Sequence, residues 1–506
     1  MVTGSVCLVT PPSAFLLDER VFVSLGILKV AAALEARQVK VNFLDLSGVE
    51  NFLSPLEDYI ASCNDMAVGI TATTPQLPAV MRITETIRRV RPDLKVVLGG
   101  PHVTLSHSAW KLERKRGISG RGHKALAQLE AAFDVLVSGD GEFAVFEALK
   151  EDAPKIVDGD DPKGGYFLTD KTFSESPWPA RHLVDMGSYR YSIEGRPSTS
   201  VVGQLGCPMG CFFCGGRNSK SLRVMRNRSV ASVVAEVEHL HRTYGYTGVM
   251  HYDDELNISR SFVDLMNGLA DLQDRLGVEF RMRGFVKSEL FTAEQAKAMY
   301  RAGFRWLLCG FEGANERILT NINKRATVED NTRCVELAKA AGLKVKALMS
   351  VGHPGESEDT IADVRDWLID MAVEDFDATV ITTYPGTPYY DLAVETSPGI
   401  WTYTHPKTGD RLHAYEVDYT ATADYYKGDP EGGYKSYVFT DHLSAERLVK
   451  LRDAVEREVR EKLKISFNPG AVALRYEHSM GMGLPDSIHR ASKAVETAGG
   501  TLSLVA

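Results

Sequence analysis

The sequence predicts an α/β protein with two successive sets of alternating strands and helices and a smaller carboxyl-terminal extension. Three observations predict this class. Short β-rich runs alternate with helical patterns over the first 150 residues. The alternation resumes at Thr199 and repeats six times, and glycine or proline follows many of the runs. The length of 506 residues is enough for roughly two to four domains.

Residues 1–150 predict a doubly wound parallel sheet, or Rossmann-like domain. The expected strands are Ser5–Thr10, Lys40–Leu46, Ala67–Ala72, Lys95–Leu98 and Asp134–Val137. The helical patterns between them include Leu25–Arg37, Leu77–Val90 and Phe143–Lys150. Right-handed crossovers join strands at this spacing, and ligands of such sheets bind at the carboxyl ends of the strands. The residues at these ends are Thr73, Thr74, Gly99, Gly100 and Gly139.

Residues 197–395 predict a partial β/α barrel of six parallel strands. The expected strands are Thr199–Leu205, Val249–Asp253, Glu279–Gly284, Phe304–Gly310, Lys344–Val351 and Ala378–Thr383. The expected helices are Val230–Tyr244, Ser259–Leu276, Ala293–Ala302, Val328–Ala341 and Thr360–Val373. The chemistry of such a barrel takes place at the carboxyl ends of its strands.

Two segments lie outside these domains. Residues 151–196 are rich in Gly, Pro and Asp, which predicts a linker. Residues 396–506 form an extension with one clear helical pattern, Ser444–Lys464. Its aromatic stretch from Trp401 to Tyr437 could cap the barrel mouth and touch substrate, or it could pack as an ordinary aromatic surface.

Composition argues against several classes of protein. The formal net charge of −9 argues against a chain whose main task is to grip nucleic acid through its phosphates. No apolar run has the length of a membrane span, and residues 1–14 lack the pattern of a secretory signal. We therefore expect a cytoplasmic protein without a membrane or nucleic-acid partner.

Three of the seven cysteines fall within eight residues, directly after the first strand of the predicted barrel. Cys207, Cys211 and Cys214 have the spacing CxxxCxxC, and thiolates in such a group bind zinc or an iron–sulfur cluster. No second pair of ligands follows, as most structural zinc sites require. Three ligands on a four-iron cube leave one iron open. A zinc site completed from elsewhere in the chain and three unrelated buried cysteines are the alternatives.

The segment from Cys207 to Cys214 resembles the CxxxCxΦC motif of the radical SAM superfamily, in which Φ is aromatic and is Phe213 here. The resemblance implies that Cys207, Cys211 and Cys214 bind a [4Fe-4S] cluster. It also implies that S-adenosylmethionine binds the fourth iron and is cleaved to a 5′-deoxyadenosyl radical. The electron would come from an external reductant of the flavodoxin or ferredoxin type.

Segments at the other strand ends of the barrel also resemble this superfamily. Tyr252-Asp253-Asp254-Glu255 stands where many members carry Gly-Gly-Glu, and Gly310-Phe311-Glu312-Gly313 resembles the GxES segment. Tyr384-Pro385-Gly386-Thr387-Pro388 resembles the segment that lines the adenine. The resemblance makes Phe213, Arg281, Arg283 and Glu312 candidates for cofactor binding, with either arginine facing the methionyl carboxylate. Asp253, Asp254 and Tyr384 are the candidate catalytic residues.

The amino-terminal domain resembles that of the cobalamin-binding branch of the superfamily. The similar segments are Pro11-Pro12, Thr71 to Gln76, Gly99 to Thr104 and Ser138 to Glu142. The cobalamin-binding residues that this resemblance implies are Thr73, Thr74, Gln76, Gly99, Gly100, His102, Val103, Thr104, Gly139, Asp140, Gly141 and Glu142. A Rossmann-like domain with another ligand, or with none, is the alternative.

Two further features bear on this domain. The chain lacks Asp-x-His-x-x-Gly, the usual signature of a histidine below the cobalt, so we expect no histidine ligand and place Gln76 at the lower face. Residues 106–132 form a basic insertion. It could be a solvated surface helix and loop, or a clamp for an anionic substrate or the cobalamin phosphate.

Together these resemblances imply a cobalamin-dependent radical SAM methyltransferase that acts on an unactivated carbon or a phosphinate phosphorus. Methylcobalamin and the deoxyadenosyl radical would carry the reaction, and the substrate would be a small molecule or a peptide. A radical rearrangement, cyclisation or oxidation with the same cofactors is the first alternative. A sensor that binds cobalamin or the cluster without turnover is the second.

Overall fold

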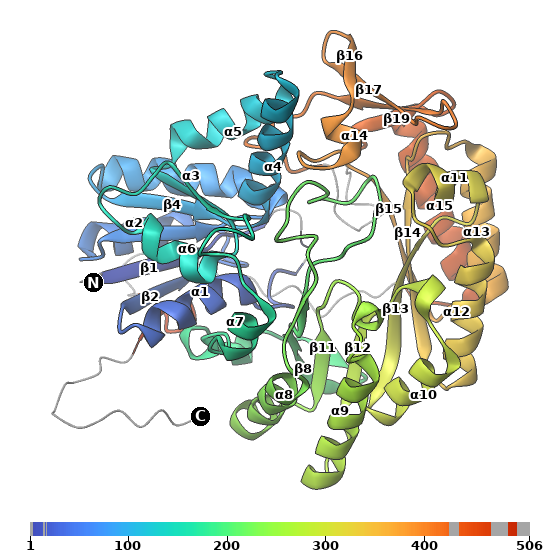
Figure 1. The fold of residues 1–506 in the computed structure, drawn as a ribbon, viewed down its shortest axis with the longest axis horizontal. Helices are drawn as coiled ribbons and strands as arrows, with labels where there is room; N and C mark the ends of the chain where they lie inside the picture. Colours follow the sequence, from blue (N-terminus) through green and yellow to red (C-terminus); the bar gives the residue numbers. More distant parts are fainter. Residues whose placement is uncertain (1–3, 14–15, 17, 425–434, 467–483, 493–506) are drawn as a thin grey trace.

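The computed structural model describes residues 4–13, 16, 18–424, 435–466 and 484–492. Its first sheet has the strand order β20-β2-β1-β3-β4-β5-β6. The strands β1, β2 and β4 of this sheet are labelled in Figure 1. The six strands β1 (Ser5–Thr10), β2 (Lys40–Asp45), β3 (Ala67–Thr71), β4 (Lys95–Gly99), β5 (Val135–Gly139) and β6 (Ile156–Gly159) run parallel. The short β20 (His489–Ala491) pairs antiparallel with β2. The predicted Rossmann-like fold of this domain is confirmed.

The helices of this domain are α1 (Leu25–Ala36), α2 (Leu53–Ser62), α3 (Leu77–Val90), α4 (Pro101–Arg116), α5 (Arg121–Ala132) and α6 (Gly141–Ala148). The strands are apolar on both faces because helices cover both faces. β6 and β20 extend the sheet beyond residue 150, the expected boundary. The short β6 lies in the Gly- and Asp-rich segment. Its composition does not predict a strand, and β6 forms because it pairs with β5.

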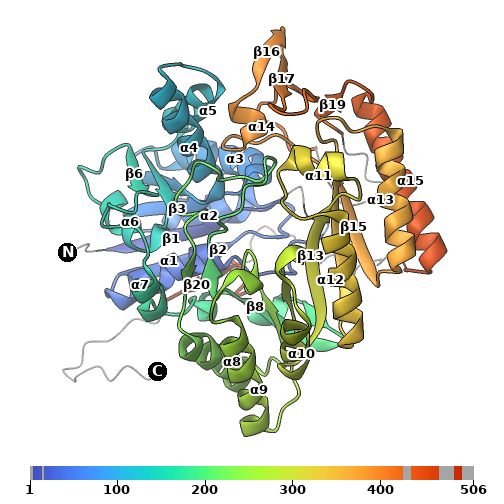
Figure 2. The same ribbon diagram turned by 45° about the vertical axis from the view of Figure 1, so that its right-hand side comes forward.

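The second sheet has the order β15-β14-β13-β12-β11-β8-β7 and forms the predicted partial barrel. Most of its strands are labelled in Figure 1, and Figure 2 shows the same sheet from another side. Its parallel strands are β8 (Arg196–Val201), β11 (Gly248–His251), β12 (Arg281–Phe285), β13 (Phe304–Glu312), β14 (Lys344–Val351) and β15 (Asp375–Val380). β7 (Ser192–Ile193) pairs antiparallel with β8 at one edge. The outer helices are α8 (Val230–Tyr244), α9 (Phe262–Leu276), α10 (Ala293–Arg301), α12 (Val328–Ala340) and α13 (Glu358–Met371).

Burial alternates along these strands and defines two faces. In β12, Met282 and Gly284 are buried, whereas Arg281, Arg283 and Phe285 are half-buried. Met282 belongs to the large core that lies between the sheet and its outer helices. Residues of the opposite parity therefore line the inner side of the curled sheet, which we call the concave face.

The carboxyl-terminal extension contains more structure than its sequence pattern predicts. A four-stranded antiparallel sheet consists of β16 (Val394–Ser397), β17 (Ile400–Thr404), β18 (Arg411–Tyr415) and β19 (Val438–Thr440). It is followed by α15 (Ala445–Leu463), which packs on α13 and β15. Part of the aromatic stretch, residues 425–434, lies outside the described residues. No helix in the described part of the chain is long and apolar enough to cross a membrane.

The basic insertion docks on this extension through α4 and α5. The Arg121 guanidinium donates to the carbonyl of Tyr390 at 2.7 Å and lies 3.8 Å from the Tyr390 ring centroid and 4.1 Å from that of Trp401. Arg116 donates to the carbonyl of Asp391 at 3.1 Å. Lys124 pairs with Glu416 at 3.3 Å. Several basic side chains of the insertion therefore join the first domain to the end of the barrel segment and to the extension.

His251, the last residue of β11, allows a test of how burial sets stability. Neither ring nitrogen has a hydrogen-bond partner among the described residues, and burial lowers its pKa from 6.5 to about 4. The ring must be neutral in the fold, so its contribution is full above pH 6.5 and is lost as the pH falls toward 4. Between pH 7 and pH 5, the wild type should lose roughly 2 kcal/mol more unfolding free energy than His251→Leu. Urea unfolding at both pH values measures this difference, and equal losses would contradict the explanation.

Candidate active site at the domain junction

The three clustered cysteines lie on a loop that begins and ends in a short ribbon of β9 (Gln204–Leu205) and β10 (Arg226–Asn227). Backbone groups of the loop are held from both sides. Arg223 donates to the carbonyls of Met209 and Pro208 at 2.7 and 2.6 Å. Asn323 donates to the carbonyl of Gly210 at 2.9 Å, and a Cβ at Gly210 would lie only 2.6 Å from that amide nitrogen. The loop conformation is therefore fixed by Arg223 within the loop and by Asn323 of the barrel.

The three cysteines are free and differ in burial: Cys211 is buried, Cys207 is half-buried and Cys214 is exposed. Burial raises the pKa of Cys207 to about 11, and the carboxylates of Glu255 and Asp254 and the thiol of Cys211 raise it further. The neighbouring thiols of Cys211 and Cys207 also raise the pKa of Cys214. Three thiols this close stay deprotonated only beside a positive centre, which an iron–sulfur cluster provides. In the described residues, no three His, Cys, Asp or Glu side chains are arranged to hold a single metal ion. The three thiols of Cys207, Cys211 and Cys214 are the ligand type that an iron–sulfur cluster requires.

Asp253 lies outside the concave face and anchors the segment that leads to the loop. Its carboxylate accepts hydrogen bonds from the backbone N–H groups of Gly203 and Gln204 at 2.5 and 2.7 Å. Burial raises its pKa to about 7, although these two bonds oppose the shift. Asp254, by contrast, is exposed. Asp253 therefore has the contacts of a positioning residue, whereas Asp254 is accessible.

Glu255 follows these two residues and has an unsatisfied carboxylate. Its Oε2 is buried and has no hydrogen-bond partner in the described part of the chain. Burial raises its pKa to about 7, although Lys324 and Lys287 lower it. Lys287 pairs with Glu289 at 2.8 Å, and Lys324 pairs with Glu312 at 3.5 Å. The free oxygen of Glu255 can accept an ammonium group, such as the methionyl amine of S-adenosylmethionine.

Glu312 ends β13 with a positive φ of 68°, which is uncommon for a residue other than glycine. Its carboxylate accepts from the Ser350 hydroxyl at 2.7 Å, and the oxygen of Ser350 lies 2.8 Å from Nε2 of His353. His353 is buried, which lowers its pKa to about 3. A neutral His353 that donates from Nε2 to Ser350 leaves the serine proton for Glu312. The ring of Phe213 packs edge-on against the ring of His353, with centroids 5.4 Å apart. This contact connects Glu312, Ser350 and His353 to the cysteine loop.

The two candidate arginines of β12 differ in their partners. Arg281, at the start of the strand, pairs with Glu279 at 2.8 Å and with Glu194 at 3.2 Å. Arg283 has no carboxylate partner among the described residues, and its Nε has no hydrogen-bond partner. Only Arg283 is therefore available to an anionic ligand.

A cavity of about 330 Å³ opens beside the carboxyl ends of the first sheet. It lies between α1, α6 and the strands, where a Cβ at Gly69 would lie 2.8 Å from a Leu8 methyl group. A Cβ at Gly141 would lie 2.9 Å from a Val30 methyl group. Side chains at these two glycines would fill the space, so the cavity depends on them. An apolar slot of this kind fits part of a large, flat ligand such as cobalamin.

The candidate cobalamin residues divide between this cavity and the loops around it. Those that line the cavity are Gly99, Gly100, Thr104, Gly139, Asp140, Gly141 and Glu142. Thr74 and Ser106 hydroxyls engage both ring nitrogens of His102, at 2.9 and 3.2 Å. The Gln76 amide is likewise engaged, by Thr73 and by the carbonyl of Pro11.

Tyr384 lies in the segment after β15, whose residue Tyr389 donates its backbone N–H to the carbonyl of Phe212 in the cysteine loop at 3.4 Å. The ring of Tyr384 packs against Tyr419, with centroids 5.7 Å apart, and it contacts the core of the first domain. The sequence alone did not indicate this position, because the partner ring comes from the extension.

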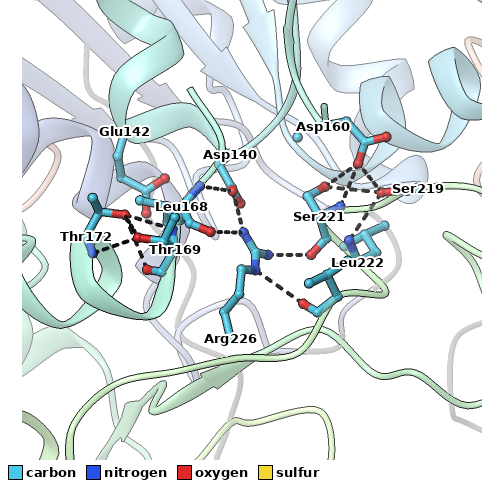
Figure 3. Close-up of polar contacts among 12 residues, drawn as sticks. Asp140, Glu142, Asp160, Leu168, Thr169, Thr172, Ser219, Ser221, Leu222 and Arg226 are labelled. Atoms are coloured by element: carbon cyan, nitrogen blue, oxygen red, sulfur yellow. Dashed lines mark hydrogen bonds and ion pairs between the residues drawn. The ribbon is translucent and has the colours of Figure 1, made fainter. Parts of the chain in front are cut away.

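Two contacts join the first domain to the cysteine loop (Figure 3). Arg226, from the base of the loop, pairs with Asp140 and donates to the carbonyls of Ser221 and Leu168. Asp160, just after β6, accepts from the Ser219 and Ser221 hydroxyls at 2.6 and 2.7 Å. The carboxyl edge of the first sheet is thereby held beside the cysteine loop.

Comparison with known proteins agrees with this arrangement. Residues 201–368 match the model of the radical SAM superfamily, and residues 19–130 match that of the B12 binding domain. The chain is a radical SAM protein with a B12-binding domain. Its cofactors are a [4Fe-4S] cluster, S-adenosylmethionine and cobalamin, as predicted.

Relatives of this radical SAM enzyme include proteins with different reactions. It is 26% identical over 377 residues to an uncharacterized methyltransferase of Pyrococcus horikoshii. The aligned region covers 72% of this chain and 77% of that relative. It is also 26% identical over 322 residues to an anaerobic magnesium-protoporphyrin IX monomethyl ester cyclase of Rubrivivax gelatinosus, with 60% and 55% coverage. The chain therefore matches only about half the length of that cyclase.

The fold is similar to that of the radical S-adenosylmethionine methyltransferase TsrM from Kitasatospora setae. The structure of TsrM with cobalamin and a [4Fe-4S] cluster bound has a TM-score of 0.59 and 19% identity, and the match covers 91% of this chain and all of that one. The structure with tryptophan substrate and an S-adenosylmethionine analogue also gives a TM-score of 0.59, with 22% identity and 79% coverage of both chains.

Proposed function

We propose that this radical SAM enzyme is a cobalamin-dependent methyltransferase that methylates an unactivated carbon or a phosphinate phosphorus. The observation that carries the proposal is the position of the cysteine loop. It lies beside the carboxyl edge of the B12-binding sheet and is fixed there by Arg226–Asp140 and Asp160–Ser221. The residues that would hold the two cofactors are therefore held side by side, which would let one substrate reach both.

When bound, cobalamin supplies the methyl group, and the cluster with S-adenosylmethionine supplies the radical. The chain supplies the binding groups. Cys207, Cys211 and Cys214 hold the cluster, and Glu255 accepts the methionyl amine through its free oxygen. Ser350 and His353 hold the Glu312 carboxylate in one orientation. Asp253 fixes the backbone before Cys207 and thereby positions the cluster.

The cavity residues hold cobalamin in this proposal, with the glycines of the strand ends allowing a close approach. His102 would not be free to bind cobalt, since the hydroxyls of Thr74 and Ser106 already hydrogen-bond its two ring nitrogens. Gln76 would have to give up its bonds to Thr73 and Pro11 to act at the lower face.

We therefore expect the reconstituted protein to bind cobalamin without a histidine ligand. The electron paramagnetic resonance spectrum of the reduced cobalt(II) form should therefore be the same in the wild type and in His102→Ala. A histidine-ligated spectrum that disappears in His102→Ala would contradict this part of the proposal.

Product analysis tests the reaction itself. The protein, loaded with cluster and cobalamin, is incubated anaerobically with S-adenosylmethionine, a flavodoxin or ferredoxin reductant and a small-molecule extract. Methyl transfer should give S-adenosylhomocysteine, deoxyadenosine and a product heavier by one methylene group. Deoxyadenosine without methylation would instead support a rearrangement, cyclisation or oxidation, which the similarity to the cyclases favours. Neither product would support a sensor.

A further inference from the structure

Four aromatic rings from distant parts of the chain meet at one edge of the concave face. Phe22, from the segment after β1, lies 4.5 Å from the Tyr191 ring and 5.4 Å from the Tyr252 ring, between centroids. Tyr252 and Phe285, which follow β11 and end β12, meet at 6.0 Å in a T-shaped arrangement. We call these four residues the aromatic cluster.

The aromatic cluster is not a closed core. Tyr252 is 50% exposed and Phe22 is 37% exposed, although both stand where the barrel faces the B12-binding domain. Large apolar side chains that remain accessible inside a fold gain from covering by a ligand. Their faces and edges favour contact with another flat, unsaturated group.

Arg283 gives this edge a positive charge that the protein does not balance. Its guanidinium lies 5.9 Å from the Tyr191 ring centroid and has no carboxylate partner in the described part of the chain. By contrast, Arg281 and Arg305, which start neighbouring strands, both pair with Glu279. The buried hydroxyl of Tyr191 lies beside Arg283, but it is neutral and supplies no counter-charge. Because this half-buried cation has no counter-ion in the described residues, we expect an anionic ligand to supply the negative charge.

We infer that the aromatic cluster and Arg283 form the substrate site, and that the substrate is a planar, unsaturated molecule that carries a carboxylate. The inference rests on the proposed function, because it places the substrate of that reaction. It assigns Arg283 to the carboxylate of the substrate. The methionyl amine of S-adenosylmethionine remains assigned to the free oxygen of Glu255. The alternation along β12 supports this assignment to the substrate, because Arg283 and Phe285 are two residues apart and therefore lie on the same, concave face.

Ligand-observed NMR on the cofactor-loaded protein tests the inference with three probes: indole-3-acetate, cyclohexylacetate and indole. Indole-3-acetate should bind at least about tenfold more tightly than either of the others, because only it combines a flat ring with a carboxylate. Arg283→Gln and Tyr252→Leu should each weaken its binding by about tenfold. Arg305→Gln is the matched control, an arginine at a strand start with a carboxylate partner, and should leave binding unchanged.

The outcomes separate this inference from the proposed function. Equal binding of the three probes, or no binding of any, overturns the inference. So does an Arg283→Gln variant that binds indole-3-acetate normally but has lost affinity for S-adenosylmethionine in calorimetry. Circular dichroism shows whether each variant is folded, and Tyr252→Leu, at an exposed position, provides a second test. Preferred binding of indole-3-acetate without any methyl transfer would retain the site and reject the methyltransferase.

Discussion

Cys211→Ala should abolish cleavage of S-adenosylmethionine, with a loss of more than about a thousandfold, because the cofactor carries the difficult chemistry. Cys211 is the buried member of the three cysteines and packs against Ile318 and Ile322 beneath the loop. The two remaining thiols cannot hold a four-iron cluster with one open iron. Iron content and deoxyadenosine formation after anaerobic reconstitution measure the effect.

Cys63→Ala is the matched control for this variant. Cys63 is half-buried at the end of α2, away from the loop, and no metal role is assigned to it. The control should keep the full iron content and the electron paramagnetic resonance signal of the reduced cluster. A Cys211→Ala protein that still forms deoxyadenosine would refute the cluster assignment, and a wild type that binds zinc in place of iron would support the zinc alternative.

The parts of the fold that depend on local pattern could be predicted from the sequence. Apolar runs such as Val96-Val97-Leu98 are long enough to identify buried parallel strands, and the cysteine spacing lies within a single loop. β15 shows the limit of this reasoning. It begins at Asp375, three residues before the expected start, because Asp375 and Asp377 face Lys346 on the concave side and do not look like strand residues in isolation.

Contacts between distant segments account for most of what the sequence did not indicate. The free oxygen of Glu255 is significant only because Lys287 and Lys324 come near it from other strand ends. Arg226 carries no motif, yet it contacts segments around residues 140, 168 and 221. Charge pairing at such separations depends on the packing of whole domains, which no local periodicity encodes.

Arg226→Met should give the largest loss of stability of any single change at the domain junction, about 3–5 kcal/mol. The Arg226 side chain is 3% exposed, and its Cζ lies 4.4 Å from the ring centroid of Phe167. Its guanidinium pairs with Asp140 and donates to the carbonyls of Ser221 and Leu168. Its removal leaves the buried Asp140 carboxyl without a cation. Urea unfolding measures the loss, and Arg275→Met, which breaks an exposed pair with Glu238, should cost less than about 1 kcal/mol.

The loss in Arg226→Met should grow with pH. Burial raises the pKa of Asp140 from 3.8 to about 7 even with Arg226 present, so the folded protein retains a proton that the unfolded chain releases. Stability from this group therefore falls as the pH rises from 3.8 to about 7, and without Arg226 the fall extends above pH 7. The double variant Asp140→Leu, Arg226→Met should recover most of the loss and lose the pH dependence, because no buried charge remains. Equal instability of the single and double variants at pH 8 would show that Arg226 acts through Ser221 and Leu168, and not through Asp140.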